Sequence, residues 1–127
     1  MKELDRFFGD LFDRKFTDCR GLLSALSQNS RFMRDKRSRG LVEALDGMVV
    51  CLEEKDAKAY VNRLSFLDEY AVKEAIKDFK DRSSSSNFLF YEDYDLGVFK
   101  AYIELLTYVL RANLFKKSEE SKVEGLP

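Results

Sequence analysis

The sequence predicts an all-α protein, folded as a single-domain bundle of four to six helices. Apolar residues recur at helical spacing along most of the first 115 positions, and the only proline is the last of the 127 residues. No segment alternates β-branched and polar residues between turn signals, which disfavours a sheet. We therefore expect one helical domain over residues 1–115, and a flexible charged tail over residues 116–127, where the periodicity is lost.

The first helix is predicted by five apolar residues at the spacing i, i+3, i+4, i+7 and i+8, which places them on one stripe. These residues are Leu4, Phe7, Phe8, Leu11 and Phe12. A short second helix is expected around Leu22, Leu23 and Leu26, with Thr17 or Asp18 as its N-terminal cap.

A third stripe runs from Leu41 through Leu45 to Leu52 and predicts another helix. Gly40 and Gly47 lower its helix propensity, by about 1 kcal/mol each relative to alanine. If Gly47 lies inside this helix, we expect close packing against a neighbouring helix to be the reason.

The next periodic run extends from Tyr60 to Phe79 and allows two interpretations. It can form one helix with a bend, which we favour. It can also break near Ser65, because Ser65 and Asp68 have the spacing of an N-terminal capping box. Residues 82–87, "RSSSSN", are interpreted as a linker, since serine hydroxyls compete for the backbone hydrogen bonds of a helix.

The closing helix is expected to begin at Asp93 or Asp95, whose carboxylates suit a helix N-terminus. From Leu96 to Leu110 it is apolar almost all round, so it is either central in the bundle or covered by another chain. The preceding segment "NFLFYED" is interpreted as a loop that presses on the core.

Several kinds of catalysis are disfavoured by the residue inventory. The chain has no histidine, which removes Ser-His and Cys-His nucleophile systems and every zinc site that needs histidine. Cys19 and Cys51 are interpreted as structural thiols, and no phosphate-binding glycine loop occurs. A magnesium site made of carboxylates alone is the remaining catalytic option, with Glu53, Glu54, Asp68, Glu69, Glu92, Asp93 and Asp95 as its candidates. We therefore expect no enzyme and no cofactor.

The charge pattern contains one marked asymmetry. Overall, 22 basic residues balance 23 acidic ones, but "SRFMRDKRSRG" (residues 30–40) holds five basic side chains against Asp35. This basic stretch is either a contact surface for a polyanion or a solvated turn between helices. If it is helical, its arginines form a ridge, with Phe32 and Met33 turned toward the core. The candidate nucleic-acid-binding residues are Arg31, Arg34, Lys36, Arg37 and Arg39.

Three segments carry a resemblance to a known family. They are "LSQNSRFMRD" (residues 26–35), "DAKAYVNRLSFLDEYAVKEAIKDF" (residues 56–79) and "EDYDLGVFKAYIELLTYVLRANLF" (residues 92–115). In order and character they resemble the small helical subunits of type III CRISPR effector complexes, which serve antiviral defence. The resemblance implies a non-catalytic subunit that stacks along a complex, with Arg31 and Arg34 contacting the phosphates of guide or target RNA.

These observations lead to two functional hypotheses. The first is a non-enzymatic subunit of a larger assembly that contacts RNA or single-stranded DNA through the basic stretch. The alternative is a protein–protein adaptor or inhibitor without a nucleic-acid role. Its interface would be the closing helix or the "NFLFY" loop, with Phe88, Phe90, Tyr91, Phe99 and Tyr102 as the candidate residues. Charges are spread through residues 1–16 and no long apolar run follows, so we expect a cytoplasmic protein without a membrane span.

Overall fold

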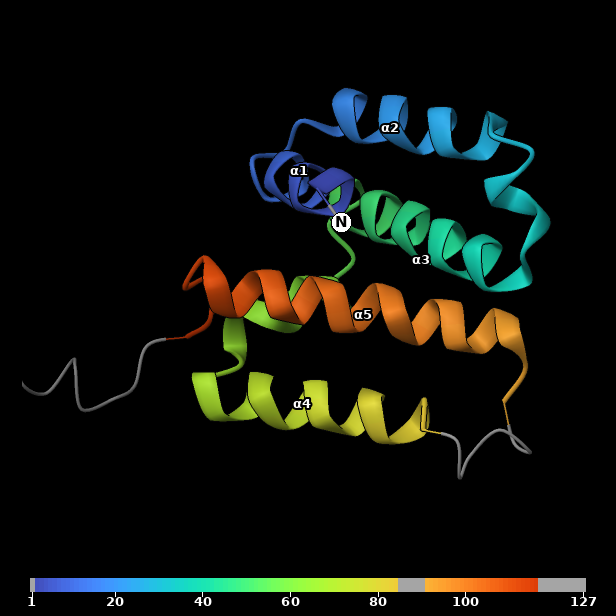
Figure 1. The fold of residues 1–127 in the computed structure, drawn as a ribbon. Helices are drawn as coiled ribbons and strands as arrows, with labels where there is room; N and C mark the ends of the chain where they lie inside the picture. The colour runs from blue at the N-terminus through green and yellow to red at the C-terminus, as the bar shows by residue number, and fades with distance from the viewer. Residues whose placement is uncertain (1, 85–90, 117–127) are drawn as a thin grey trace, which may run out of the picture.

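The computed structural model describes residues 2–84 and 91–116, and these residues form a bundle of five α-helices with two short 3-10 helices (Figure 1). The elements are α1 (Lys2–Phe12), α2 (Phe16–Gln28), η1 (Phe32–Arg34), α3 (Lys36–Glu53), η2 (Tyr60–Phe66), α4 (Glu69–Arg82) and α5 (Asp93–Arg111). No β-strand occurs among the described residues, where a single bridge joins Asp68 to Lys116. The predicted all-α bundle is thereby confirmed.

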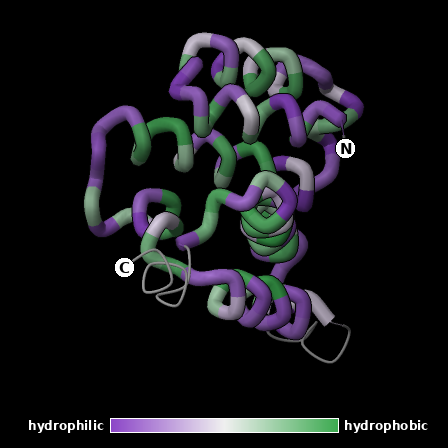
Figure 2. Tube along the Cα trace, turned by 90° about the vertical axis from the view of Figure 1, so that its left-hand side faces the viewer, coloured by the Kyte–Doolittle hydropathy of each residue, from purple (hydrophilic) through white to green (hydrophobic). Residues whose placement is uncertain are grey.

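Helix α5 lies in the middle of the bundle. It packs most extensively on α3, and on its other side against α4, while α1 also contacts it (Figure 1). Figure 2 looks along α5 and shows α4 beneath it, with mostly hydrophilic residues along the part of its trace that faces away from α5. Helix α2 covers α3 from outside. The all-round apolar character of α5 is therefore accounted for by burial between helices of the same chain.

The core is built mainly from α1, α3 and α5. In α1, Leu4, Phe7, Phe8 and Leu11 are each at most 1% exposed, as the predicted stripe requires. The ring of Phe8 lies 5.8 Å from that of Tyr108 in α5, which connects the first helix to the last. Helix α4 contributes less, because Val72 is its one fully buried residue.

Two glycines allow α3 and α5 to touch backbone to backbone. A Cβ atom added to Gly97 would lie 1.9 Å from the carbonyl oxygen of Arg37, and one added to Gly40 would lie 2.1 Å from that of Tyr94. Any side chain larger than hydrogen would therefore push the helices apart. The expectation that Gly47 serves close packing is wrong, because a Cβ atom there would meet nothing within 4 Å.

Other departures from the expected elements have local causes. The chain from Tyr60 to Phe79 is not one bent helix, because Leu67 and Asp68 are extended and separate η2 from α4. Asp68 is itself the N-terminal cap, since its carboxylate accepts a hydrogen bond from the Ala71 amide at 2.8 Å. Neither Thr17 nor Asp18 caps α2, which begins after Lys15 without a side-chain cap.

The remaining segment predictions are only partly described. Helix α5 begins at Asp93 as expected, with a capping box between Glu92 and Asp95. In the linker, Ser83 is the C-terminal cap residue of α4, and its hydroxyl donates to the carbonyl oxygen of Phe79 at 2.9 Å. Residues 85–90 and the tail from residue 117 lie outside the described residues.

The two cysteines are free thiols and should differ in reactivity. Cys19 is fully buried, and its thiol donates a hydrogen bond to the carbonyl oxygen of Phe7. Burial, reinforced by the negative charges of Asp10 and Asp18, raises the pKa of this thiol to about 11. Cys51 is half-buried. Because the thiolate is the reactive form, we expect the native protein to release one equivalent of chromophore from a disulfide reagent at about pH 8, and the denatured protein two. Release of two equivalents at one rate from the native protein would contradict this assignment.

Candidate functional site

The basic stretch spans the connection between α2 and α3 and does not form one continuous helix. Arg31 directly precedes the 3-10 turn η1 and Arg34 is its last residue, whereas Lys36, Arg37 and Arg39 belong to the start of α3. Asp35 between the two groups is extended, with φ −83° and ψ 128°. The arginine ridge that a continuous helix would have formed is therefore absent. Phe32 and Met33 pack against the core as expected, so Phe32 is not a free stacking ring.

Two of the five cations have intramolecular partners. The guanidinium of Arg39 donates from Nε to the carbonyl oxygen of Met33 at 2.7 Å and from Nη2 to that of Arg34 at 3.3 Å. Arg39 thus supports the backbone of the turn, and its guanidinium is not available for bidentate binding of a ligand. Arg37 forms an exposed ion pair with Asp93 at 3.7 Å, which ties the start of α3 to the start of α5.

Arg31, Arg34 and Lys36 remain open to solvent. All three are exposed and form no ion pair with any other residue that the structure describes. The carboxylate of Asp35 is occupied, because it caps α3 by accepting a hydrogen bond from the Arg37 amide at 3.0 Å. Lys36 and Arg37 stand in the first turn of α3, where positive charge opposes the helix dipole at about 0.3–1 kcal/mol per residue. The positive charge of this surface therefore lowers the stability of α3.

The predicted protein-interface residues fall into two groups. Phe88 and Phe90 lie outside the described residues. Tyr91, Phe99 and Tyr102 are half-buried members of an aromatic cluster between η2, α4 and α5, which Tyr60 and Phe79 complete. Tyr102 stacks on Phe79 with ring centroids 5.4 Å apart, and Tyr91 meets Phe99 edge to face at 4.9 Å. These three rings therefore use much of their surface to hold α4 and the start of α5 in place.

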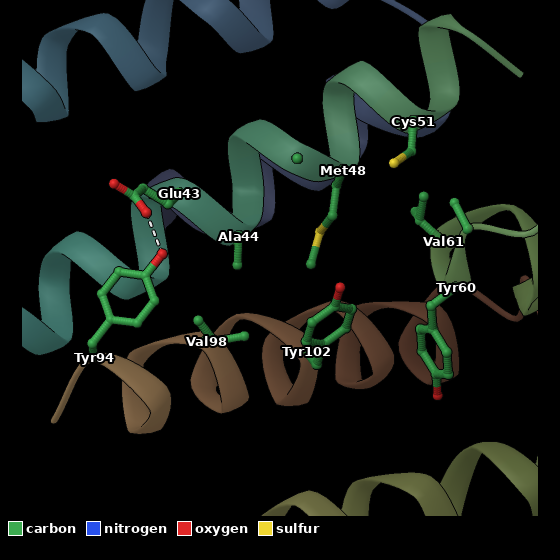
Figure 3. Close-up of a pocket in the computed structure, with 11 residues that line it drawn as sticks. Glu43, Ala44, Met48, Cys51, Tyr60, Val61, Tyr94, Val98 and Tyr102 are labelled. Atoms are coloured by element: carbon green, nitrogen blue, oxygen red, sulfur yellow. Dashed lines mark hydrogen bonds between the residues drawn. The ribbon is translucent and has the colours of Figure 1, made fainter. Parts of the chain in front are cut away.

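A groove of about 290 Å³ lies between α3, α5 and η2 (Figure 3). Figure 3 shows the Tyr102 hydroxyl directed toward α3 and the Cys51 side chain directed from α3 into the groove. At one end, the Tyr94 hydroxyl donates to the Glu43 carboxylate, and this hydrogen bond raises the pKa of Tyr94. Sequence reasoning did not identify this groove, because it forms where the open side of Gly47 faces two distant segments.

Phe66 and Tyr70 are the most exposed large apolar side chains described, at 74% and 71%. They lie on either side of the junction between η2 and α4. Sequence reasoning missed them because residues 60–79 were interpreted as one helix with a single apolar face. The signal was present, since both aromatic residues fall outside the stripe that contains Leu64, Leu67 and Phe79.

Most of the candidate magnesium ligands have structural partners. Glu53 pairs with Arg20, Asp68 caps α4, Glu69 pairs with Lys73, and Asp93 pairs with Arg37, while Glu92 and Asp95 form the capping box of α5. Among the described residues, no group of three or more cysteine and acidic side chains is arranged to hold a metal ion.

No protein-family model matches the chain, and no curated protein or solved structure matches it either. The resemblance to small subunits of type III CRISPR effector complexes accordingly stays a prediction. Within the described ranges, no helix combines the length and the apolar character that crossing a membrane requires.

Proposed function

We propose that the protein is a non-enzymatic helical module that works as one subunit of a larger assembly and contacts the backbone of RNA or single-stranded DNA. The contact surface consists of Arg31, Arg34 and Lys36, with Arg37 at its edge. The observation that carries the proposal is that these three cations are exposed and have no ion-pair partner among the described residues, although Lys36 stands where a helix disfavours positive charge.

The proposed binding is electrostatic. Each phosphate neutralised by a cation releases condensed counterions, so the affinity falls as the salt concentration rises. With three or four phosphates contacted, the logarithm of the affinity for a single strand should fall with the logarithm of the salt concentration at a slope of about −2 to −3. Arg31 and Arg34 supply planar forks for phosphate oxygens, and Lys36 supplies a point charge. The half-buried ring of Phe32 stacks on no base, so the binding depends little on sequence.

The experiment is a fluorescence anisotropy titration of labelled single-stranded RNA with the full chain, in low and in moderate salt. The test variant carries Arg31→Ala, Arg34→Ala and Lys36→Ala. We expect it to bind at least about tenfold more weakly in low salt and to lose most of the salt dependence.

The matched control variant carries Lys58→Ala, Lys77→Ala and Lys100→Ala. These are three exposed cations outside the basic stretch, so this variant has the same net charge as the test variant. It should bind within about threefold of the original chain. If both variants bound RNA equally weakly, the binding would depend on net charge alone and not on the basic stretch. A wild-type protein that binds no RNA in low salt would also contradict the proposal. Circular dichroism should be the same for all three proteins.

A protein–protein adaptor is the second candidate function, and the exposure of Phe66 and Tyr70 favours it. An adaptor interface on a face of the closing helix has less support, because α5 is enclosed by α3 and α4. The two functions are compatible, because the junction that carries these aromatic residues and the start of α3 lie at opposite ends of the bundle (Figure 1).

A further inference from the structure

The junction between η2 and α4 presents an aromatic patch, which consists of Tyr60, Arg63, Phe66, Leu67 and Tyr70. Phe66 stands out because every other described phenylalanine is buried or half-buried. Tyr70 is almost as exposed, and 36% of Tyr60 is accessible. Large aromatic side chains gathered at a surface mark an interaction site more often than a solvated face.

The patch is hollowed and its backbone is held in place. A groove of about 340 Å³, the size of the smaller ligand pockets, is lined by Tyr60, Arg63, Phe66 and Leu67. The carbonyl oxygen of Leu67 accepts a hydrogen bond from the Lys116 amide at 2.6 Å, so the segment after α5 supports the wall of the groove. Val61 and Leu64, on the inner side of η2, are buried in the core. The groove is therefore preorganised for a side chain to enter.

The charges at the junction define the complementary partner. Arg63 is exposed and forms no hydrogen bond or ion pair through its side chain with the described residues. The nearby acids are engaged, since Asp68 caps α4 and Glu69 pairs with Lys73 at 3.2 Å. The unpaired charge is thus a guanidinium beside an apolar groove, which suits a carboxylate that follows or precedes an apolar side chain.

A nucleic acid fits this patch less well than a peptide. Single-stranded nucleic acids need a positively charged track beside the stacking rings, whereas Arg63 is the single cation among the residues that line this groove. We infer that the aromatic patch docks a short acidic–apolar peptide segment of a partner protein, with an apolar side chain in the groove and a carboxylate on Arg63. This docking is independent of the proposed RNA contact.

The test is a titration of the isotope-labelled full chain, followed by the amide resonances of residues 60–70. The probe is the peptide acetyl-Gly-Glu-Phe-Glu-Leu-Gly-amide, and its neutral analogue has glutamine in place of both glutamates. We expect the acidic peptide to shift these resonances with a Kd below about 1 mM, and the neutral one to bind about threefold more weakly.

Three variants assign the interaction to residues. Arg63→Gln should abolish the preference for the acidic peptide, Phe66→Ala should abolish binding of both peptides, and Lys77→Gln, at an exposed cation of α4, should change neither. All three change exposed side chains, so circular dichroism should confirm that each variant is folded.

Four results would overturn the inference. The first two are no shift at residues 60–70 with the acidic peptide, and equal affinity for both peptides in the wild type. The third is a shift of the same resonances by single-stranded RNA without any by the peptides, which would assign the patch to nucleic acid. The fourth is a shift of the resonances of residues 60–70, in the absence of peptide, when Glu119→Gln, Glu120→Gln and Glu124→Gln are introduced together. Such a shift would show that residues 117–127 of the same chain occupy the groove. The RNA titration of the basic-stretch variants tests the proposed RNA contact separately, whichever of these four results is obtained.

Discussion

Replacing Gly97 by alanine should destabilise the protein by about 3 kcal/mol or more. The added methyl carbon would lie 1.9 Å from the carbonyl oxygen of Arg37 and 2.9 Å from the amide nitrogen of Leu41, and both atoms belong to the backbone of α3. No rotamer change can relieve such a contact, so the backbones of α3 and α5 must move apart at this point. Urea denaturation followed by circular dichroism would measure the loss.

The control for this substitution is Gly47→Ala in the middle of α3. The new methyl group would meet no atom within 4 Å, so the higher helix propensity of alanine should stabilise the protein by about 0.5–1 kcal/mol. The same chemical change should therefore have opposite signs at the two glycines. A Gly97→Ala variant as stable as the wild type would show that the helices do not touch at this point.

Replacing Phe8 by alanine should lower the free energy of unfolding by about 3–5 kcal/mol. Phe8 is 1% exposed and its ring packs edge to face on Phe7 at 5.4 Å and against Tyr108 at 5.8 Å. The substitution removes the ring, leaves a cavity and weakens the connection between α1 and α5. Thermal denaturation should show a lower Tm, and hydrogen exchange should accelerate throughout α1.

Phe66→Ala provides the comparison at a surface position. This ring is 74% exposed, so its removal should change the stability by no more than about 0.5 kcal/mol. The same variant is expected to lose peptide binding, which separates the role of Phe66 from that of a core residue. A large destabilisation by Phe66→Ala would indicate instead that its ring is packed.

The fold class could be predicted because helical periodicity is a local property of the sequence. The stripe of α1 and the acidic start of α5 needed no information from distant residues. The break at Leu67 was harder, since a 3-10 helix repeats every three residues and its apolar positions resemble those of an α-helix over one or two turns. Gly97 passed unnoticed because the requirement for glycine comes from Arg37, which is 60 positions away.

The candidate site could be located from the sequence, but the roles of its members could not be distinguished. Five basic residues in a short stretch can be recognised from the sequence alone. That Arg39 supports the carbonyl groups of Met33 and Arg34 depends on the extended backbone at Asp35. The aromatic patch depends in turn on where η2 ends, because that position decides which rings face the core and which face solvent.

The close backbone approach of α3 and α5 at Gly40 and Gly97 also has a consequence for the proposed binding of RNA. Lys36 and Arg37 lie within about one helical turn of the backbone contact, and Asp93, the partner of Arg37, lies one turn from Gly97. The backbone contact and the ion pair thus hold the start of α3 in place before a ligand binds. At Lys36 and Arg37, the conformational entropy lost on binding is therefore mainly that of ordering the two side chains.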